Sequence, residues 1–250
     1  MNTLWWTVVL VALLPSPLAA QSLAERVRGA PAGTVRLSFA ARDGVCGRGP
    51  NSITIVSGDT SDEWESDCER GPVRVSLRVG GGRVTGSETY VGGRWRPGNA
   101  GVTDLGTVPA RQAADLLLEL APSVGEDGGE LVMAATLADS VVVWPKLLRM
   151  ARDAGIGQET RRQAVFWLGQ AAGEAATRGL DSLAGDNRGD LEIRKQAVFA
   201  LSQRPAEEGV PALIRIARTH RHPELRKQAL FWLGQSEDPR ALSLFEEILR

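Results

Sequence analysis

The sequence predicts an α+β protein of more than one domain, in which a small antiparallel β module is followed by a right-handed α-solenoid. Three observations carry this prediction. A ten-residue stretch occurs three times in the C-terminal half, and short runs of alternating apolar and polar residues precede it. The only two cysteines lie among those short runs. Because the apolar period is about 3.6 residues in the repeated stretch and 2 in the earlier runs, the two parts differ in secondary structure.

Residues 1–20 are predicted to be a secretory signal peptide. They carry no charged side chain, are apolar from Leu4 to Leu14 and end in small residues. This pattern is typical of an exported chain that is cleaved near Ala20. The apolar run is shorter than the roughly 20 residues that span a bilayer, so we expect no stable membrane insertion after cleavage. An uncleaved anchor is the alternative.

Residues 34–108 are predicted to form the β module. Five short runs in this region are rich in Val, Ile and Thr, and they cover residues 34–40, 52–57, 73–79, 83–90 and 102–108. Several alternate apolar with polar residues, as expected for half-buried antiparallel strands. Three consecutive glycines, residues 80–82, separate two of the runs and predict a hairpin turn, because glycine adopts positive φ at little cost.

The two cysteines, Cys46 and Cys68, are predicted to form a disulfide within this module. Both lie beyond the expected cleavage point, and an exported chain folds where disulfides persist. In the chain-entropy model such a bond stabilises the fold by about 3 kcal/mol. Two unpaired thiols are the alternative, because spacing alone does not establish the geometry of a bond.

From Pro109 onward the apolar period is that of a helix, and residues 109–250 are predicted to form the solenoid. The repeated stretches are RRQAVFWLGQ at 161–170, RKQAVFALSQ at 194–203 and RKQALFWLGQ at 226–235. A different helix precedes each of them: WPKLLRMAR at 144–152 aligns with VPALIRIAR at 210–218, and TRGLDSLA at 177–184 keeps the leucines of that pattern. Residues 242–249 supply one more such first helix. A period of this length indicates helical units that bury their apolar faces against their neighbours.

This alternation of two helix types resembles the HEAT repeats in their short bacterial form. The resemblance covers residues 142–250, and residues 109–141 read as a degenerate capping unit. It implies a HEAT-like α-solenoid, and it suggests a bacterial envelope protein by analogy. Most proteins with such repeats are interaction scaffolds and a minority are enzymes, so the resemblance is more informative about fold than about function.

The second helix of each unit has two distinct faces at 100° per residue. One stripe, which includes Ala164, Trp167 and Leu168 in the first copy, is expected to pack on the first helix of the unit. The opposite side carries a cation, a phenylalanine and a glutamine in every copy, and we call it the recurring surface: Arg162, Phe166, Gln170, Lys195, Phe199, Gln203, Lys227, Phe231 and Gln235.

In solenoids of this kind the second helices line the concave face, so the recurring surface is the candidate site for a protein or peptide partner. The alternative is that the phenylalanines pack sideways against adjacent second helices while the polar groups are solvated. Arg161, Arg194 and Arg226 lie between the two faces. They are expected to pair with acidic or carbonyl groups of adjacent units.

The sequence contains no pattern typical of an enzyme or of a cofactor site. A nucleophile elbow, a phosphate-binding loop and a complete dinucleotide fingerprint are all missing. His220 and His222 are the only histidines, and two ligands are too few for a metal site. The acidic segment 59–69 does not match a calcium loop and is expected to be solvated. We therefore expect no metal and no cofactor.

The net charge of -1 offers no field that would attract nucleic acid, so no nucleic-acid partner is expected. The densest basic group, Arg215, Arg218, Arg221, Arg226 and Lys227, is interpreted as a solvated face. The predicted function is a non-catalytic scaffold for protein–protein interaction in the bacterial cell envelope, exported to the periplasm or outside the cell. The alternative is a lyase-like HEAT-repeat enzyme or a small-ligand-binding protein.

Overall fold

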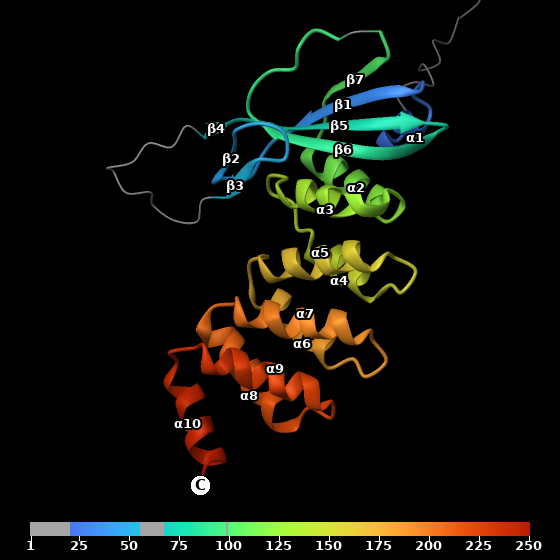
Figure 1. The fold of residues 1–250 in the computed structure, drawn as a ribbon. Coiled ribbons are helices and arrows are strands. Elements are labelled where there is room, and N and C mark those ends of the chain that lie inside the picture. The colour runs from blue at the N-terminus through green and yellow to red at the C-terminus, as the bar shows by residue number, and fades with distance from the viewer. Residues whose placement is uncertain (1–20, 56–67, 99) are drawn as a thin grey trace, which may run out of the picture.

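The computed structural model describes residues 21–55, 68–98 and 100–250, and it places a β module at one end of a stack of helix pairs (Figure 1). The predicted α+β fold class is confirmed. The predicted signal peptide and most of the acidic segment lie outside the described residues. In the part of the chain that is described, no helix combines the length and the apolar character that crossing a bilayer requires.

Two sheets make up the β module. The larger has the strand order β6-β5-β1-β7 and contains β1 (Gly33–Phe39), β5 (Val73–Gly80), β6 (Arg83–Val91) and β7 (Val102–Thr107). The smaller has the order β3-β2-β4 and contains β2 (Val45–Gly47), β3 (Ile53–Ile55) and β4 (Glu69–Arg70). The pairs are antiparallel as predicted, except that β7 lies parallel to β1. The alternating pattern of β7 is the same in either direction, so it does not reveal this difference.

The predicted glycine turn joins β5 to β6, where Gly81 and Gly82 have φ values of 59° and 73°. These values are those of a tight hairpin turn that other residues adopt only with strain. The apolar residues of β5 are buried on one face of the sheet, while Arg74 and Ser76 point to the other. A short helix, α1 (Leu23–Arg28), begins with a capping box between Ser22 and Glu25 and buries two of its apolar residues in the same core.

Nine longer helices follow the β module in the described part of the chain. They are α2 (Ala110–Leu120), α3 (Gly128–Thr136), α4 (Trp144–Arg152), α5 (Gln158–Gly169), α6 (Glu174–Ala184), α7 (Leu191–Ser202), α8 (Ala206–Thr219), α9 (Pro223–Gly234) and α10 (Pro239–Ile248). Two short turns of 3₁₀-helix, Ala121–Ser123 and Gly125–Asp127, separate α2 from α3. The three repeated stretches lie in α5, α7 and α9, as the periodicity predicts.

The helices α2 and α3 connect the sheet to the stack. α3 contacts β6 on one side and α5 on the other (Figure 1). The backbone amide of Arg42 donates to Leu137 O at 2.8 Å, and that of Asp139 donates to Ala40 O at 3.0 Å, which ties the end of β1 to the end of α3. Buried apolar residues form one continuous cluster from Leu23 to Leu244. The β module and the helices therefore share a single core.

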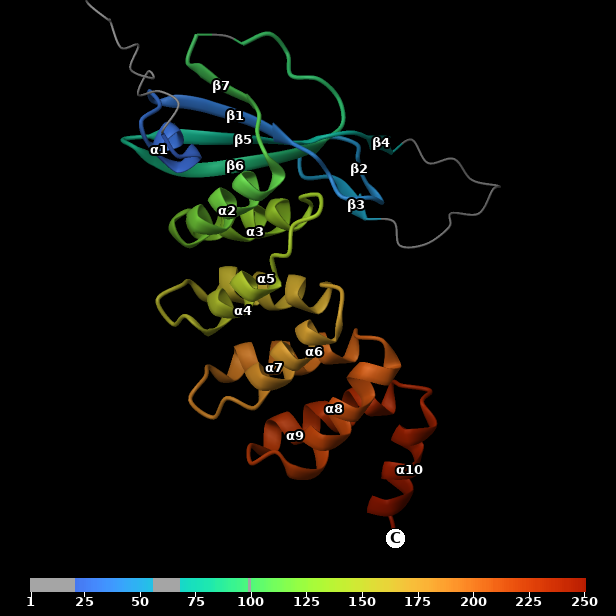
Figure 2. The same cartoon turned by 180° about the vertical axis from the view of Figure 1, so that it is seen from behind.

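The stack curves toward its second helices. α3, α5, α7 and α9 contact one another in succession, and they do so more extensively than the first helices α4, α6 and α8. Figure 2 shows the same stack from behind. A stack whose elements lie closer together on one side bends toward that side, so α5, α7 and α9 line the concave face.

The predicted disulfide is present. Cys46 in β2 is bonded to Cys68, with a Cα–Cα distance of 5.3 Å and a sequence separation of 22 residues. Cys46 is buried, and Glu69 and Arg70 beyond Cys68 form β4, which pairs with β2. The bond thus joins β2 to the segment that leads into β4, within the small sheet.

Replacing both cysteines, Cys46→Ala with Cys68→Ala, is expected to lower the free energy of unfolding by about 3 kcal/mol, because the unfolded chain gains the freedom of the opened loop. Urea denaturation of the variant and of the parent measures the difference. Adding a reductant to the parent should reproduce it, and identical midpoints with and without reductant would contradict this role.

Candidate functional site

Buried arginines hold two of the second helices, α5 and α7, to the first helix of the same unit. Arg161 and Arg194 expose only 7% and 4% of their surface. Arg161 Nε donates to Ala151 O at 3.2 Å, and Arg194 Nε donates to Ala184 O at 3.1 Å. These carbonyls lie in the last turns of α4 and α6, where a helix lacks partners for its own acceptors and favours a cation. Both arginines pair with carbonyl groups, but these carbonyls belong to the same unit and not to an adjacent unit as predicted.

The same guanidinium groups reach the following unit. Arg161 Nη1 lies 3.4 Å from Asp190 Oδ2, and the other oxygen of Asp190 caps the start of α7. Arg194 Nη2 lies 3.1 Å from Nε2 of His220, which follows α8. Arg161 therefore fixes the position of its unit against the next one as well as the geometry within its own unit.

A further arginine, Arg204, reaches back across a unit boundary. Its guanidinium donates to Gly169 O at 3.0 Å, to Ala171 O at 2.5 Å and to Thr177 Oγ1, and it pairs with Glu208 at 2.9 Å. It therefore satisfies the carbonyls at the end of α5 from a position just beyond α7. The repeat pattern does not indicate this role, because Arg204 lies outside the repeated stretch.

The structure keeps most of the recurring surface accessible. Phe166 and Phe231 expose 37% and 56% of their surface, whereas Lys195 and Phe199 are half-buried. Five polar members of the set are exposed: Arg162, Gln170, Gln203, Lys227 and Gln235. A groove of about 410 Å³ runs across α5, α7 and α9, and its lining residues are Gln158, Arg162, Glu192, Lys195, Gln196 and Gln228.

The three phenylalanines differ in their packing. The Phe199 ring lies 5.1 Å from that of Trp232 on the next second helix, which is the sideways packing of the alternative interpretation. Phe166 and Phe231 lie edge-on to the tryptophan that follows each of them, at 5.2 and 4.9 Å, and remain exposed. Only two of the three rings are thus available to a partner.

The cations and the amides of the recurring surface lie at opposite ends of the helices. Arg162 pairs with Glu159 at 3.2 Å and Lys195 pairs with Glu192 at 3.1 Å. Such exposed pairs contribute little to stability, so a partner's carboxylate can replace the glutamates at small cost. Gln170 and Gln235 instead line separate small cavities near the helix C-termini, with volumes of about 380 and 220 Å³.

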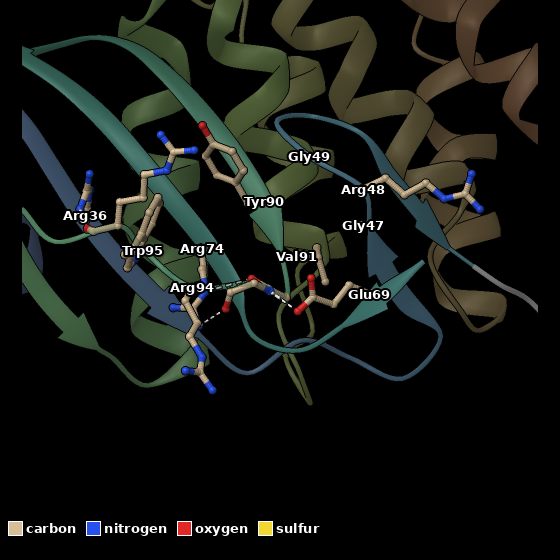
Figure 3. Close-up of a pocket in the computed structure, with 13 residues that line it drawn as sticks. Arg36, Gly47, Arg48, Gly49, Glu69, Arg74, Tyr90, Val91, Arg94 and Trp95 are labelled. Atoms are coloured by element: carbon tan, nitrogen blue, oxygen red, sulfur yellow. Dashed lines mark hydrogen bonds between the residues drawn. The ribbon is translucent and has the colours of Figure 1, made fainter. Parts of the chain in front are cut away.

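A second site lies on the face of the large sheet that carries its polar residues. It is a cavity of about 780 Å³, which we call the arginine cavity (Figure 3). Its charged and aromatic lining residues are Arg36, Arg48, Glu69, Arg74, Tyr90, Arg94, Trp95 and Arg96. Arg74 of β5 and Tyr90 of β6 are direct cross-strand neighbours. The sequence pattern alone does not single out these residues, although the outward positions of the strands contain the arginines.

Hydrogen bonds and ring contacts define the walls of the arginine cavity. The guanidinium carbon of Arg36 lies 4.9 Å from the centre of the Trp95 ring, and Tyr90 meets the same ring edge-on at 5.6 Å. Arg74 donates to the carbonyls of Gly92 at 2.9 Å and Gly93 at 2.8 Å. Figure 3 shows Arg36, Trp95, Tyr90 and Arg74 side by side on the sheet. The cavity therefore has fixed walls before any ligand arrives.

His220 lies at the boundary of two units, in surroundings that disfavour its protonated form. Its Nδ1 accepts the backbone N–H of His222 at 3.0 Å, so the neutral ring carries its proton on Nε2, which donates to Ala184 O at 3.2 Å. Burial, and then the charge of Arg194, lower the pKa of His220 below its usual value. Within the described residues, no three His, Cys, Asp or Glu side chains are grouped as metal ligands.

The predicted basic group is largely paired. Arg215 forms an ion pair with Asp181, and Arg218 forms one with Glu247. Arg226 donates to the carbonyls of His220 at 2.7 Å and Arg221 at 3.1 Å. These contacts tie the group to neighbouring elements, so the predicted solvated face is largely exposed but is also partly structural.

The family model for HEAT repeats matches residues 186–250. This segment contains α7, α8, α9 and α10, and so two of the three repeated stretches. The predicted resemblance to HEAT repeats is confirmed for this segment. No curated protein matches the chain significantly.

Arg161→Met is expected to lower the free energy of unfolding by about 2–4 kcal/mol, because it leaves the buried Ala151 carbonyl without a donor and Asp190 without its cation. The adjacent Arg162→Met is the matched control and should cost less than about 0.5 kcal/mol, since Arg162 is exposed. Denaturant titration of both variants measures the effect, and equal losses would contradict the assigned role of Arg161.

The protein is expected to lose stability as the pH falls from 7.5 to 5.5. Because the folded protein lowers the pKa of His220, the unfolded chain takes up this proton first, and the free energy of unfolding decreases below a pH of about 6.5. His220→Gln should remove most of this dependence, whereas the control His222→Gln should retain it. Urea titrations at the two pH values decide, and a parent protein of equal stability at both would be inconsistent with a depressed pKa.

Proposed function

We propose that the protein is a non-catalytic scaffold of the bacterial cell envelope that binds a protein or peptide partner through the concave surface of α5, α7 and α9. The observation that carries this proposal is the exposure of Phe166 and Phe231 on the helices that border the groove. In the described residues, the other large exposed apolar side chains lie before α4 or in and directly after α10.

The curvature of the stack supports this choice of surface. Helical repeats present extended concave faces, and other proteins commonly use these faces to bind protein partners. Aromatic and arginine side chains contribute a large share of binding energy at protein interfaces. Arg162 and Phe166 are of these two types, and they lie one helical turn apart on α5.

The chemistry of the groove suggests the kind of partner. Its cations, Arg162 and Lys195, are held by glutamates of the same helix, which a partner's carboxylates can displace. Phe166 and Phe231 offer apolar contacts beyond the groove. The expected partner is therefore a peptide segment or protein surface that combines acidic side chains with apolar anchors.

The lack of catalysis is part of the proposal. The groove is lined by amides and by paired charges, without a histidine, serine or cysteine among the residues that form it. Two of its ionisable lining groups, Glu192 and Lys195, pair with each other and are not arranged with a nucleophile. Export to the envelope is supported by the disulfide, which persists in oxidising compartments, and by the composition of residues 1–20.

The double variant Phe166→Ser with Phe231→Ser is expected to abolish capture of the partner from an envelope fraction while leaving the melting temperature within a few degrees of the parent, since both rings are exposed. Phe199→Ala should instead cost about 1–3 kcal/mol of stability, because its ring packs on Trp232. Capture followed by mass spectrometry, together with thermal melts, separates the two effects.

The matched control is Leu242→Ser with Ile248→Ser, which removes a similar amount of exposed apolar surface from α10. It should retain the partner. If the phenylalanine variant also retains the partner, the concave surface is not the site. A small molecule that co-purifies with the parent and is lost in that variant would favour the ligand-binding or lyase-like alternative.

A further inference from the structure

The lining of the arginine cavity carries a large excess of positive charge. Five arginines and one glutamate line it, so its formal charge is 5 − 1 = +4, although the whole chain is nearly neutral. Within the described residues, none of these five arginines forms an ion pair with a carboxylate. Like charges repel when they are gathered at one site, so this arrangement is stabilised when an anion neutralises it.

Two of the arginines have structural tasks. Arg74 donates hydrogen bonds to the carbonyls of Gly92 and Gly93 and to Ser38 Oγ, the last at 3.1 Å. Arg36 stacks on Trp95 and donates to Arg96 O at 2.9 Å. These contacts fix the bend after β6 and leave the cavity rigid on that side.

Three of the arginines have no guanidinium partner among the described residues. Arg48, Arg94 and Arg96 are exposed, and their guanidinium groups form no hydrogen bond with any described residue. They reach the cavity from two separate segments, since Arg48 follows β2 and the other two follow β6. Figure 3 shows Arg48 and Arg94 on different sides of the site.

The walls also contain more donors than acceptors. Arg36 Nε and Trp95 Nε1 are buried without an acceptor among the described residues. The carboxylate of Glu69 is already used, because Oε1 accepts the N–H of Gly93 at 2.7 Å. A ligand that supplies acceptor oxygens would satisfy what the protein leaves unpaired.

We infer that the arginine cavity binds a ligand that carries two or more phosphate groups. Guanidinium groups recognise phosphate through paired charge-assisted hydrogen bonds. The oxygens of a phosphate point in several directions and can meet arginines that arrive from different segments, whereas the two oxygens of a carboxylate lie in one plane. The phosphate groups come from a soluble phosphorylated compound or from a lipid headgroup. This site lies outside the concave surface and does not depend on the proposed scaffold function.

Titration calorimetry with inorganic pyrophosphate tests the inference on the disulfide-bonded protein. Saturable binding is expected, and its affinity should fall with added salt. The variant Arg48→Gln with Arg94→Gln should weaken binding at least about tenfold, because each exchange removes a charge-assisted contact. The control Arg26→Gln with Arg83→Gln removes the same charge from exposed positions outside the cavity and should change the affinity less than about twofold.

Two further binding measurements identify the ligand chemistry. Citrate should bind more weakly than pyrophosphate. Vesicles of phosphatidylcholine with phosphatidylglycerol separate the sources: binding that pyrophosphate reverses assigns the phosphate to a headgroup, and pyrophosphate binding without vesicle binding assigns it to a soluble compound.

Three results with soluble ligands would overturn the inference. They are the absence of saturable pyrophosphate binding, equal losses in the two double variants, and an affinity for citrate as high as that for pyrophosphate. If the protein binds vesicles but does not bind pyrophosphate, and pyrophosphate does not release the vesicles, the contact is a flat charged surface. That result would also count against the cavity. Near-ultraviolet circular dichroism checks that the variants keep the parent fold.

Discussion

The hydrogen bonds from buried arginines to the last carbonyls of the first helices are the contacts on which the helical stack depends. A helix ends with acceptors that its own backbone leaves unpaired, and burying them without donors is costly. Arg161 and Arg194 supply donors in successive units. Because Arg161 also pairs with Asp190 of the following unit, this one side chain links the geometry of its own unit to the position of the next.

The stack was predictable because its information is repeated. Three copies of one helix in phase define the period, and the position of Arg161 between two faces indicates an acidic or carbonyl partner without deciding which unit supplies it. The exposure of the phenylalanines was not predictable from a single copy. Phe199 is covered because the next helix offers Trp232, and a side chain on Gly169 would approach Ala200 Cβ to 3.1 Å, so α5 and α7 lie close together there. The exposure of each phenylalanine thus depends on contacts between neighbouring units, which the sequence of a single unit does not contain.

The β module was less predictable from the sequence than the helical stack. Alternation identifies strands and their buried faces, yet β2 and β4 have three and two residues, too few to display any period. The arginine cavity could not be predicted from the sequence, for a related reason. Arg36, Arg74 and Trp95 lie far apart along the chain, and an arginine at an outward strand position has the same pattern as a solvated one. Only the pairing of β1 with β5 and the bend after β6 bring these side chains together.

The core that runs without interruption from Leu23 to Leu244 has a thermodynamic consequence for both surfaces. α3 packs against β6 on one side and against α5 on the other. Unfolding of the sheet would therefore expose apolar area on α3. Any ligand that binds only the folded state adds its binding free energy to the whole cooperative unit. A ligand on the sheet face would therefore protect the helices that border the concave groove against unfolding, as well as the β module itself.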